Sequence, residues 1–89
     1  MTYLRRIAQL VSDLRELDVI KEEDKIEYGC IDVHQITIST RIPEDKEEPS
    51  IIIRYTMIYN AFLEEFSQEE IVDQEYDCNK VNFVFRRKS

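Results

Sequence analysis

The amino-terminal segment has the apolar spacing of an amphipathic helix. Its apolar residues recur at intervals of four, three, four and three positions, at Tyr3, Ile7, Leu10, Leu14 and Leu17, and Leu4 and Val11 widen the stripe. Residues three or four apart share one face of a helix, so the segment predicts a helix packed on a core, with Thr2 as its N-cap. The polar residues between them are predicted to face water: Arg5, Arg6, Gln9, Asp13 and Glu16.

The next segment, Asp18 to Lys25, has five charged residues in a row at positions 21–25. It predicts a solvated connection or a frayed helical turn that ends the helix. From Ile26 onward the pattern is that of a strand, because apolar and polar residues alternate. The inward positions of its second half are His34, Ile36, Ile38, Thr40 and Ile42. Ile31 and Val33 have the opposite parity, which indicates a bulge near Asp32 or a strand start covered on both faces.

The densest apolar segment, residues 50–66, changes its period midway. The residues that alternate as in a strand are Ile51, Ile53, Tyr55 and Met57. Ile58, Phe62 and Phe66 then recur every four residues, as on one face of a helix. We therefore predict a strand that pairs antiparallel with the strand ending at Ile42 and runs directly into a helix. Residues 43–49, with a proline at each end, are predicted to form an exposed acidic loop.

The carboxy-terminal third predicts a short helix and a last strand. Residues 67–70 read Ser-Gln-Glu-Glu, which is the pattern of a capping box at the start of a helix. Residues 77–80 are predicted to turn the chain, and Val81, Phe83 and Phe85 then show the two-residue period of a strand. The basic residues 86–89 are predicted to form a mobile tail.

Together these patterns predict a small single α+β domain over residues 1–89. An amphipathic N-terminal helix and short helices would pack on a three-stranded antiparallel sheet, in the order α-β-β-α-(α)-β. A chain of 89 residues supports one core. No apolar run reaches the roughly 18 residues needed to cross a bilayer, and the N-terminus lacks the pattern of an export signal, so we expect a cytoplasmic protein.

The sequence offers little for catalysis or metal binding. The one histidine, His34, falls within a predicted strand and has no partner residue at a catalytic spacing. A metal site could be assembled only from Cys30, His34 and Cys78 with Asp32 or Asp77. This set lacks the paired short spacings typical of zinc sites. Gly29 is the single glycine, which excludes a glycine-rich phosphate loop. We therefore expect no enzyme, no metal and no cofactor.

The two cysteines are far apart in the sequence and are expected to be reduced thiols partly packed in the core. A disulfide between them stays open, since sequence separation does not forbid it.

Acidic residues dominate the charge of the chain. The net charge is −7, and residues 44–77 contain eleven acidic residues against two basic ones, a local balance of −9. Such a surface repels phosphate, so direct nucleic-acid binding and adhesion to anionic membranes are disfavoured. It suits a protein partner with a basic surface.

One acidic set has the spacing of a binding face. On a continuous helix, Glu65, Glu69 and Asp73 would lie on one side about 6 Å apart, a spacing similar to that of phosphates along a nucleic-acid strand. We therefore hypothesise a non-catalytic acidic module, an inhibitor or adaptor that engages a basic surface of a nucleic-acid-binding protein as a nucleic-acid mimic. Its predicted partner-binding residues are Glu44, Asp45, Glu47, Glu48, Glu64, Glu65, Glu69, Glu70 and Asp73.

In overall make-up the chain resembles the small acidic inhibitors that viruses and mobile elements direct at host nucleases, although it contains no residue motif of any one family. A second hypothesis is a homodimer or assembly subunit that uses the Ile-rich sheet or the apolar stripe of the first helix.

Overall fold

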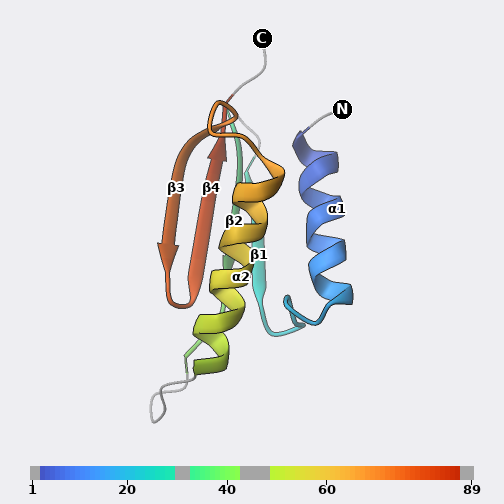
Figure 1. Ribbon diagram of the computed structural model, residues 1–89, viewed down its shortest axis with the longest axis vertical. Coiled ribbons are helices and arrows are strands. Elements are labelled where there is room, and N and C mark those ends of the chain that lie inside the picture. Colours follow the sequence, from blue (N-terminus) through green and yellow to red (C-terminus); the bar gives the residue numbers. More distant parts are fainter. Residues whose placement is uncertain (1–2, 30–32, 43–48, 87–89) are drawn as a thin grey trace.

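The structure, a computed structural model, describes residues 3–29, 33–42 and 49–86 and has the predicted α+β class (Figure 1). Its elements are α1 (Tyr3–Glu16), β1 (Lys25–Gly29), β2 (His34–Ser39), α2 (Pro49–Glu65), β3 (Ile71–Asp77) and β4 (Lys80–Phe85). The sheet has four antiparallel strands, in the order β1-β2-β4-β3, where the sequence predicted three. Neither described helix combines the length and apolar character that crossing a membrane requires.

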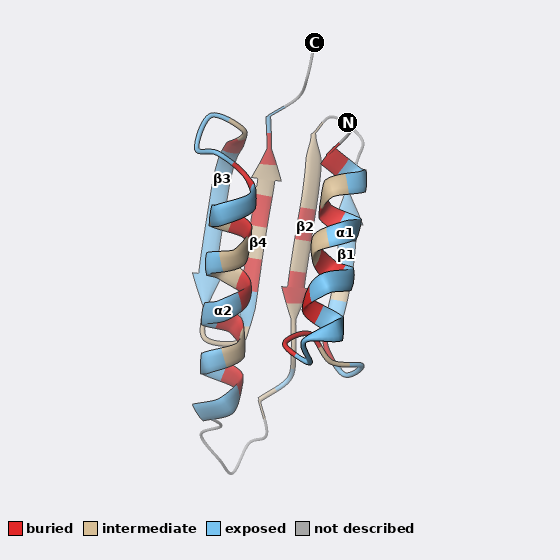
Figure 2. Cartoon of the chain, turned by 45° about the vertical axis from the view of Figure 1, so that its right-hand side comes forward, coloured by how far each residue is buried: buried red, intermediate tan, exposed pale blue. Residues whose placement is uncertain are grey.

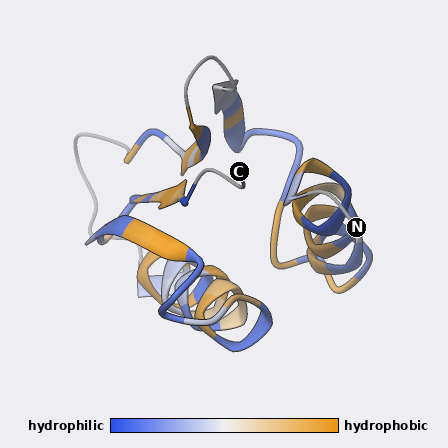
Figure 3. Ribbon diagram, turned by 90° about the horizontal axis from the view of Figure 1, so that it is seen from above, coloured by the Kyte–Doolittle hydropathy of each residue, from blue (hydrophilic) through white to orange (hydrophobic). Residues whose placement is uncertain are grey.

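The fold consists of two helix–hairpin units with the same topology. The first unit is α1-β1-β2 and the second is α2-β3-β4, and the antiparallel pair of β2 and β4 joins them at the centre of the sheet. Exchanging the two units leaves the strand order unchanged, so the topology has an internal pseudo-two-fold axis between β2 and β4. Seen end-on, the two helices lie on the same side of the strands (Figure 3).

The core lies between the helices and one face of the sheet, where the buried residues of both meet (Figure 2). Ile36 is opposite Phe83 and Ile38 is opposite Val81 across the central strand pair. The ring of Phe83 stacks on Phe62 of α2, with centroids 4.9 Å apart. All five of these side chains are almost fully removed from water, and aliphatic and aromatic burial of this kind supplies most of the free energy of folding.

Helix α1 confirms the first prediction, with changes at its flanks. Its buried residues are Tyr3, Ile7, Val11 and Leu14. Leu4 and Leu17, predicted on the apolar stripe, are exposed, and Leu17 is 71 % exposed. Thr2, the predicted N-cap, lies outside the described residues.

The end of α1 is a Schellman motif. Asp18 has a positive φ of 60°, which aspartate tolerates better than most residues. The Asp18 N–H donates to the Arg15 carbonyl (3.0 Å) and the Val19 N–H donates to the Leu14 carbonyl (2.9 Å). The motif turns Val19 and Ile20 into the core, so the prediction of a fully solvated connection at 18–25 is wrong at these positions.

Residues 50–57 are helical, and the prediction of a strand there is wrong. The buried residues of α2 are Ile51, Tyr55, Ile58 and Phe62, at intervals of four, three and four. The strand parity also placed Ile53 and Met57 inside, but both are exposed. Pro49, predicted in the loop, is the first residue of α2, where its missing N–H costs no helical hydrogen bond. The rest of that loop, residues 43–48, lies outside the described part of the chain.

The single strand predicted from Ile26 to Ile42 is two strands. β1 and β2 form an antiparallel hairpin in which Ile26 is opposite Ile38 and Tyr28 is opposite Ile36. The change of parity near Asp32 therefore marks the connection between two strands, and residues 30–32 in it lie outside the described residues. The predicted pairing of this segment with residues 50–57 does not form, because β2 pairs with β1 and β4.

The predicted short helix after Ser67 is absent, since the chain continues into strand β3. One of the two capping-box bonds forms, since the Ser67 N–H donates to Glu70 Oε1 (3.0 Å), whereas the Glu70 N–H donates to the Ser67 carbonyl (3.0 Å). These bonds close a turn between α2 and β3, so the Ser67 and Glu70 groups find partners without a helix.

The last strand and the turn before it are confirmed as β4 and the β3–β4 connection. Arg86 is held in place, because its N–H donates to the Glu70 carbonyl (2.7 Å) and its Nε donates to the Glu69 carbonyl (2.8 Å). The predicted mobile tail therefore does not begin at Arg86, and residues 87–89 lie outside the described residues.

Candidate functional site

The structure divides the predicted partner-binding residues. Glu64 and Glu65 end α2, Glu69 and Glu70 lie in the turn that follows, and Asp73 lies in β3. The predicted helical face of Glu65, Glu69 and Asp73 is therefore wrong. Glu44, Asp45, Glu47 and Glu48 lie outside the described residues.

Two of the predicted carboxylates are occupied within the molecule. Arg6 Nη1 lies 2.5 Å from Glu70 Oε2, and Arg6 Nε lies 3.6 Å from Glu65 Oε1. The Arg6 guanidinium also lies 4.4 Å above the ring of Phe66. The hydrogen bond from Arg6, followed by the one from the Ser67 N–H, lowers the pKa of Glu70. Arg6 thus does not simply face water as predicted, and Glu65 and Glu70 tie the end of α2 to α1.

A second set of carboxylates points to open solvent. The register of β3 shifts between Ile71 and Asp73, where Val72 is an additional residue. Ile71 is opposite Phe85 on the helix side of the sheet, whereas Asp73 is opposite Val84 on the other face. A bulge of this kind moves every following side chain to the opposite face.

As a result, Asp73, Glu75 and Asp77 lie in line on the face of the sheet that carries no helix. We call these three residues the β3 acidic row. All three are exposed. Alternate residues of a strand are about 7 Å apart, which is twice the axial phosphate spacing of about 3.4 Å along one strand of B-DNA. The period of two was visible in the sequence Asp-Gln-Glu-Tyr-Asp, although the prediction included only its first member.

Polar residues beside the row on this open face are held by hydrogen bonds. Gln35 Nε2 and Thr37 Oγ1 both donate to Asn82 Oδ1, at 2.9 Å and 2.6 Å. The Lys80 ammonium lies 3.8 Å from Glu75 at the margin of the row. Ordered amide and hydroxyl groups beside the carboxylates give the face a defined shape.

A buried ionic network centres on Asp24, which sequence reasoning placed in a solvated segment. Arg54 Nη1 donates to Asp24 Oδ2 (2.6 Å), Tyr55 OH donates to Oδ1 (2.7 Å) and the Lys21 N–H donates to Oδ2 (2.7 Å). Arg54 Nη1 also donates to the carbonyl of Val19 (2.7 Å). The Asp24 side chain is 0 % exposed. This network clamps the α1–β1 connection onto α2.

The protonation of the network follows from its geometry. Burial alone would raise the pKa of Asp24, but the hydrogen bonds from Arg54, the Lys21 N–H and Tyr55 outweigh burial, so the pKa is lowered. Burial, followed by the hydrogen bond to Asp24, raises the pKa of Tyr55. The network thus holds an ionised carboxylate and a neutral phenol, which suits a structural clamp.

This lowered pKa predicts a loss of stability in acid. Because the carboxylate of Asp24 is favoured in the folded state, its contribution is complete above the unfolded pKa of about 3.9 and is lost as the pH falls through the lower folded pKa. Urea unfolding measured between pH 7 and pH 2, roughly the range over which carboxyl groups titrate, checks it. The Asp24→Asn variant should lack this component of the decline. Parallel curves for the two proteins would contradict the assignment.

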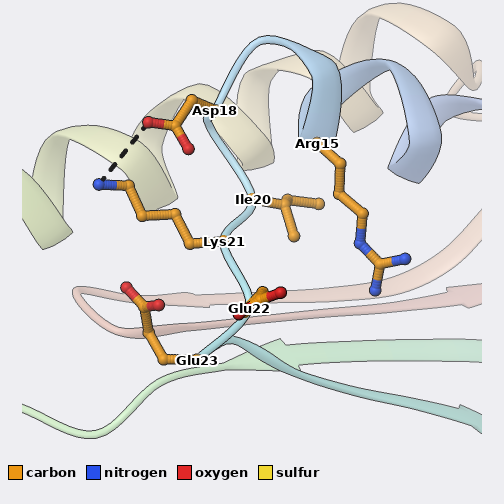
Figure 4. Close-up of a pocket in the computed structure, with 6 residues that line it drawn as sticks. All are labelled: Arg15, Asp18, Ile20, Lys21, Glu22 and Glu23. Carbon is orange, nitrogen blue, oxygen red and sulfur yellow. Dashed lines mark ion pairs between the residues drawn. The ribbon is translucent and has the colours of Figure 1, made fainter.

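An open hollow of about 660 Å³ lies beside this network (Figure 4). It is lined by Arg15, Asp18, Ile20, Lys21, Glu22 and Glu23. Its walls carry charges of both signs, and Lys21 and Asp18 lie 3.9 Å apart as an ion pair. Ligand pockets are mostly apolar with a few polar groups. The hollow has the reverse composition, so it adds no candidate ligand site.

The proposed metal-ligand set is not brought together. His34 is opposite Phe85 and the Asp77–Lys80 pair closes the other end of β4, so His34 and Cys78 are separated by the length of β4, about 17 Å. His34 packs near the ring of Tyr3 (5.8 Å), and Cys78 is a half-buried free thiol in the β3–β4 turn. Cys30 and Asp32 lie outside the described residues. Within the described ranges, no group of three or more His, Cys, Asp or Glu residues is arranged to hold a metal ion.

Comparisons with protein-family models, with curated proteins and with solved structures found no match for this chain.

Proposed function

We propose that this protein is a non-catalytic binding module that presents the β3 acidic row to a basic surface of a nucleic-acid-binding protein, as an inhibitor or adaptor. The observation that supports it is the alignment of Asp73, Glu75 and Asp77 on the sheet face opposite the two described helices, α1 and α2. Glu69, in the turn before β3, and Glu64, near the end of α2, are also exposed.

The row is suited to a partner that binds phosphates. Three like charges at regular spacing repel one another in the free protein, and a basic partner removes this repulsion on binding. Because the charges lie on a paired strand, their spacing is fixed before the encounter, which limits the entropy lost on binding. Asp73 and Asp77 also accept the neighbouring Gln74 and Cys78 N–H groups, at 2.9 Å and 2.7 Å, which restrains both carboxylates.

Neutralising the row should weaken binding to a cationic probe. We expect the D73N/E75Q/D77N variant to bind a fluorescent decalysine peptide roughly tenfold or more weakly than the wild type, because three aligned charges are lost. Asn and Gln keep the size of each side chain, so the strand should remain folded. Fluorescence anisotropy at about 50 mM and about 300 mM salt measures the affinity and its dependence on screening.

A matched control separates the row from net charge. The D13N/E16Q/E22Q variant removes the same number of negative charges from exposed residues of α1 and the connection after it. It should bind the peptide within about threefold of the wild type. Equal weakening in both variants would remove the row as the binding site.

The partner class has its own test. Immobilised wild-type protein should retain a nucleic-acid-binding protein from cell lysate, added duplex DNA should displace that protein, and the row variant should not retain it. Retention by both proteins, or failure of DNA to compete, would contradict the mimicry of a nucleic acid.

A further inference from the structure

The two surfaces that the sequence suggested for self-association are largely used within the protomer. Most of the apolar stripe of α1 and the isoleucines of β2 lie in the protomer's own core, although Leu4 and Leu17 of the stripe are exposed. Within the described residues, β1 and β3 each pair with one neighbour only, which leaves an open edge on either side of the sheet. An edge strand presents unpaired N–H and C=O groups and can accept another strand.

The two edges differ in charge. A second β3 beside β3 would bring members of the β3 acidic row close to one another, and like charges on neighbouring strands repel. On the same open face, β1 carries Lys25 and Glu27, which have opposite signs. The β3 edge is therefore protected against a second copy, whereas the β1 edge is complementary to itself.

We propose that β1 pairs antiparallel with β1 of a second copy of this chain, about a two-fold axis at Ile26, to form one continuous eight-stranded sheet. In this register Lys25 lies opposite Glu27 of the second copy, and the symmetry creates the same pair twice. Within one strand the two side chains are 72 % and 61 % exposed and 3.6 Å apart, so both are accessible to a second chain.

Charge also selects the register. Moving the axis to Glu27 would place the two copies of Glu27 directly opposite each other, which is unfavourable. Only the register centred on Ile26 pairs both charges of each strand.

The helix side of β1 supports the same junction. Tyr28 is 49 % exposed there, and Ile26 is only partly buried. In the proposed register Ile26 faces Ile26 of the second copy, and Tyr28 lies diagonal to it, within reach of an aromatic side chain. Pairing would thus cover apolar surface that the protomer leaves open.

A charge swap tests the register. Sedimentation equilibrium over about 1–200 µM should show wild-type dimers that form with increasing concentration. The K25E and E27K variants should each raise the dimer dissociation constant roughly 10- to 100-fold, because both cross-strand pairs become like-charged. The double variant K25E/E27K, which restores opposite charges, should return to within about threefold of the wild type.

The matched control is E16K, which reverses the charge of an exposed residue on helix α1 rather than on a strand at the sheet edge and should leave the dissociation constant unchanged. Circular dichroism of each variant establishes that it is folded. A wild type that stays monomeric at the highest concentration, single variants that dimerise normally, or a double variant that fails to recover would each overturn the proposal. The β3 acidic row stays exposed in this dimer, so decalysine binding is tested independently of it.

Discussion

Replacing Asp24 with Asn should lower the free energy of unfolding by about 3–5 kcal/mol, the cost of removing one partner from a buried ion pair. The Arg54 side chain is only 12 % exposed and would lose its counterion. An amide also offers a single acceptor oxygen where Arg54, Tyr55 and the Lys21 N–H now use two. Urea unfolding at pH 7 measures the difference.

The control is Asp18→Asn, the same chemical change in the same connection. Asp18 is 81 % exposed and lies 3.9 Å from Lys21, and asparagine also tolerates its positive φ. We expect a change within about 0.5 kcal/mol. If the two variants were equally stable, Asp24 would not be a buried clamp.

Truncating Phe83 to Ala should cost about 3–5 kcal/mol, because the side chain is fully buried and a cavity would remain. Its ring stacks on Phe62 (4.9 Å) and Tyr59 (5.6 Å) of α2 and it lies opposite Ile36 of β2, so packing is lost both between α2 and the sheet and across the central strand pair. For a chain of 89 residues this is a large share of a total stability of about 5–10 kcal/mol. Thermal and urea unfolding monitored by circular dichroism measure it.

The neighbouring residue provides a matched control. Val84 is half-buried on the open face of the same strand, and Val84→Ala should cost about 1 kcal/mol or less. A reversed order of the two effects would mean that the faces of β4 are assigned the wrong way round.

The sequence predicted α1 and β4 well because the apolar residues of α1 follow only a helical period and those of β4 only a strand period. Val81, Phe83 and Phe85 fit a strand and no face of a helix. In residues 50–57 both periods coexist, since Ile51 and Tyr55 belong to the strand parity and to the helical stripe. The β-branched residues favoured the strand, but helix α2 buries Ile51 and Tyr55 together with the later helical positions, so tertiary packing decided.

Strand β3 was missed because an edge strand need not alternate apolar and polar residues. Of its seven residues only Ile71 is buried, so the segment carries almost no hydrophobic period. The bulge at Val72 also places Ile71 and the acidic residues that follow it on opposite faces, so the two do not form one continuous period.

No local sequence pattern predicts that Asp24 is buried. Asp24 and Arg54 are 30 residues apart, and Asp24 sits in a run of exposed charges. Asp24 differs from its neighbours because it lies where the α1–β1 connection packs against α2. Of the β3 acidic row, the sequence prediction included only Asp73, because the geometry of the row depends on strand pairing that the pattern did not show.

The matching topology of the two halves also bears on chain connectivity. The ring of Tyr3, where α1 begins, stacks on that of Phe85 at the end of β4, with centroids 5.4 Å apart. A short linker could therefore join the present ends, and new ends could be placed between Ile42 and Pro49. Such a circular permutant would run helix, hairpin, helix, hairpin as before, and each helix would still precede the strands it covers.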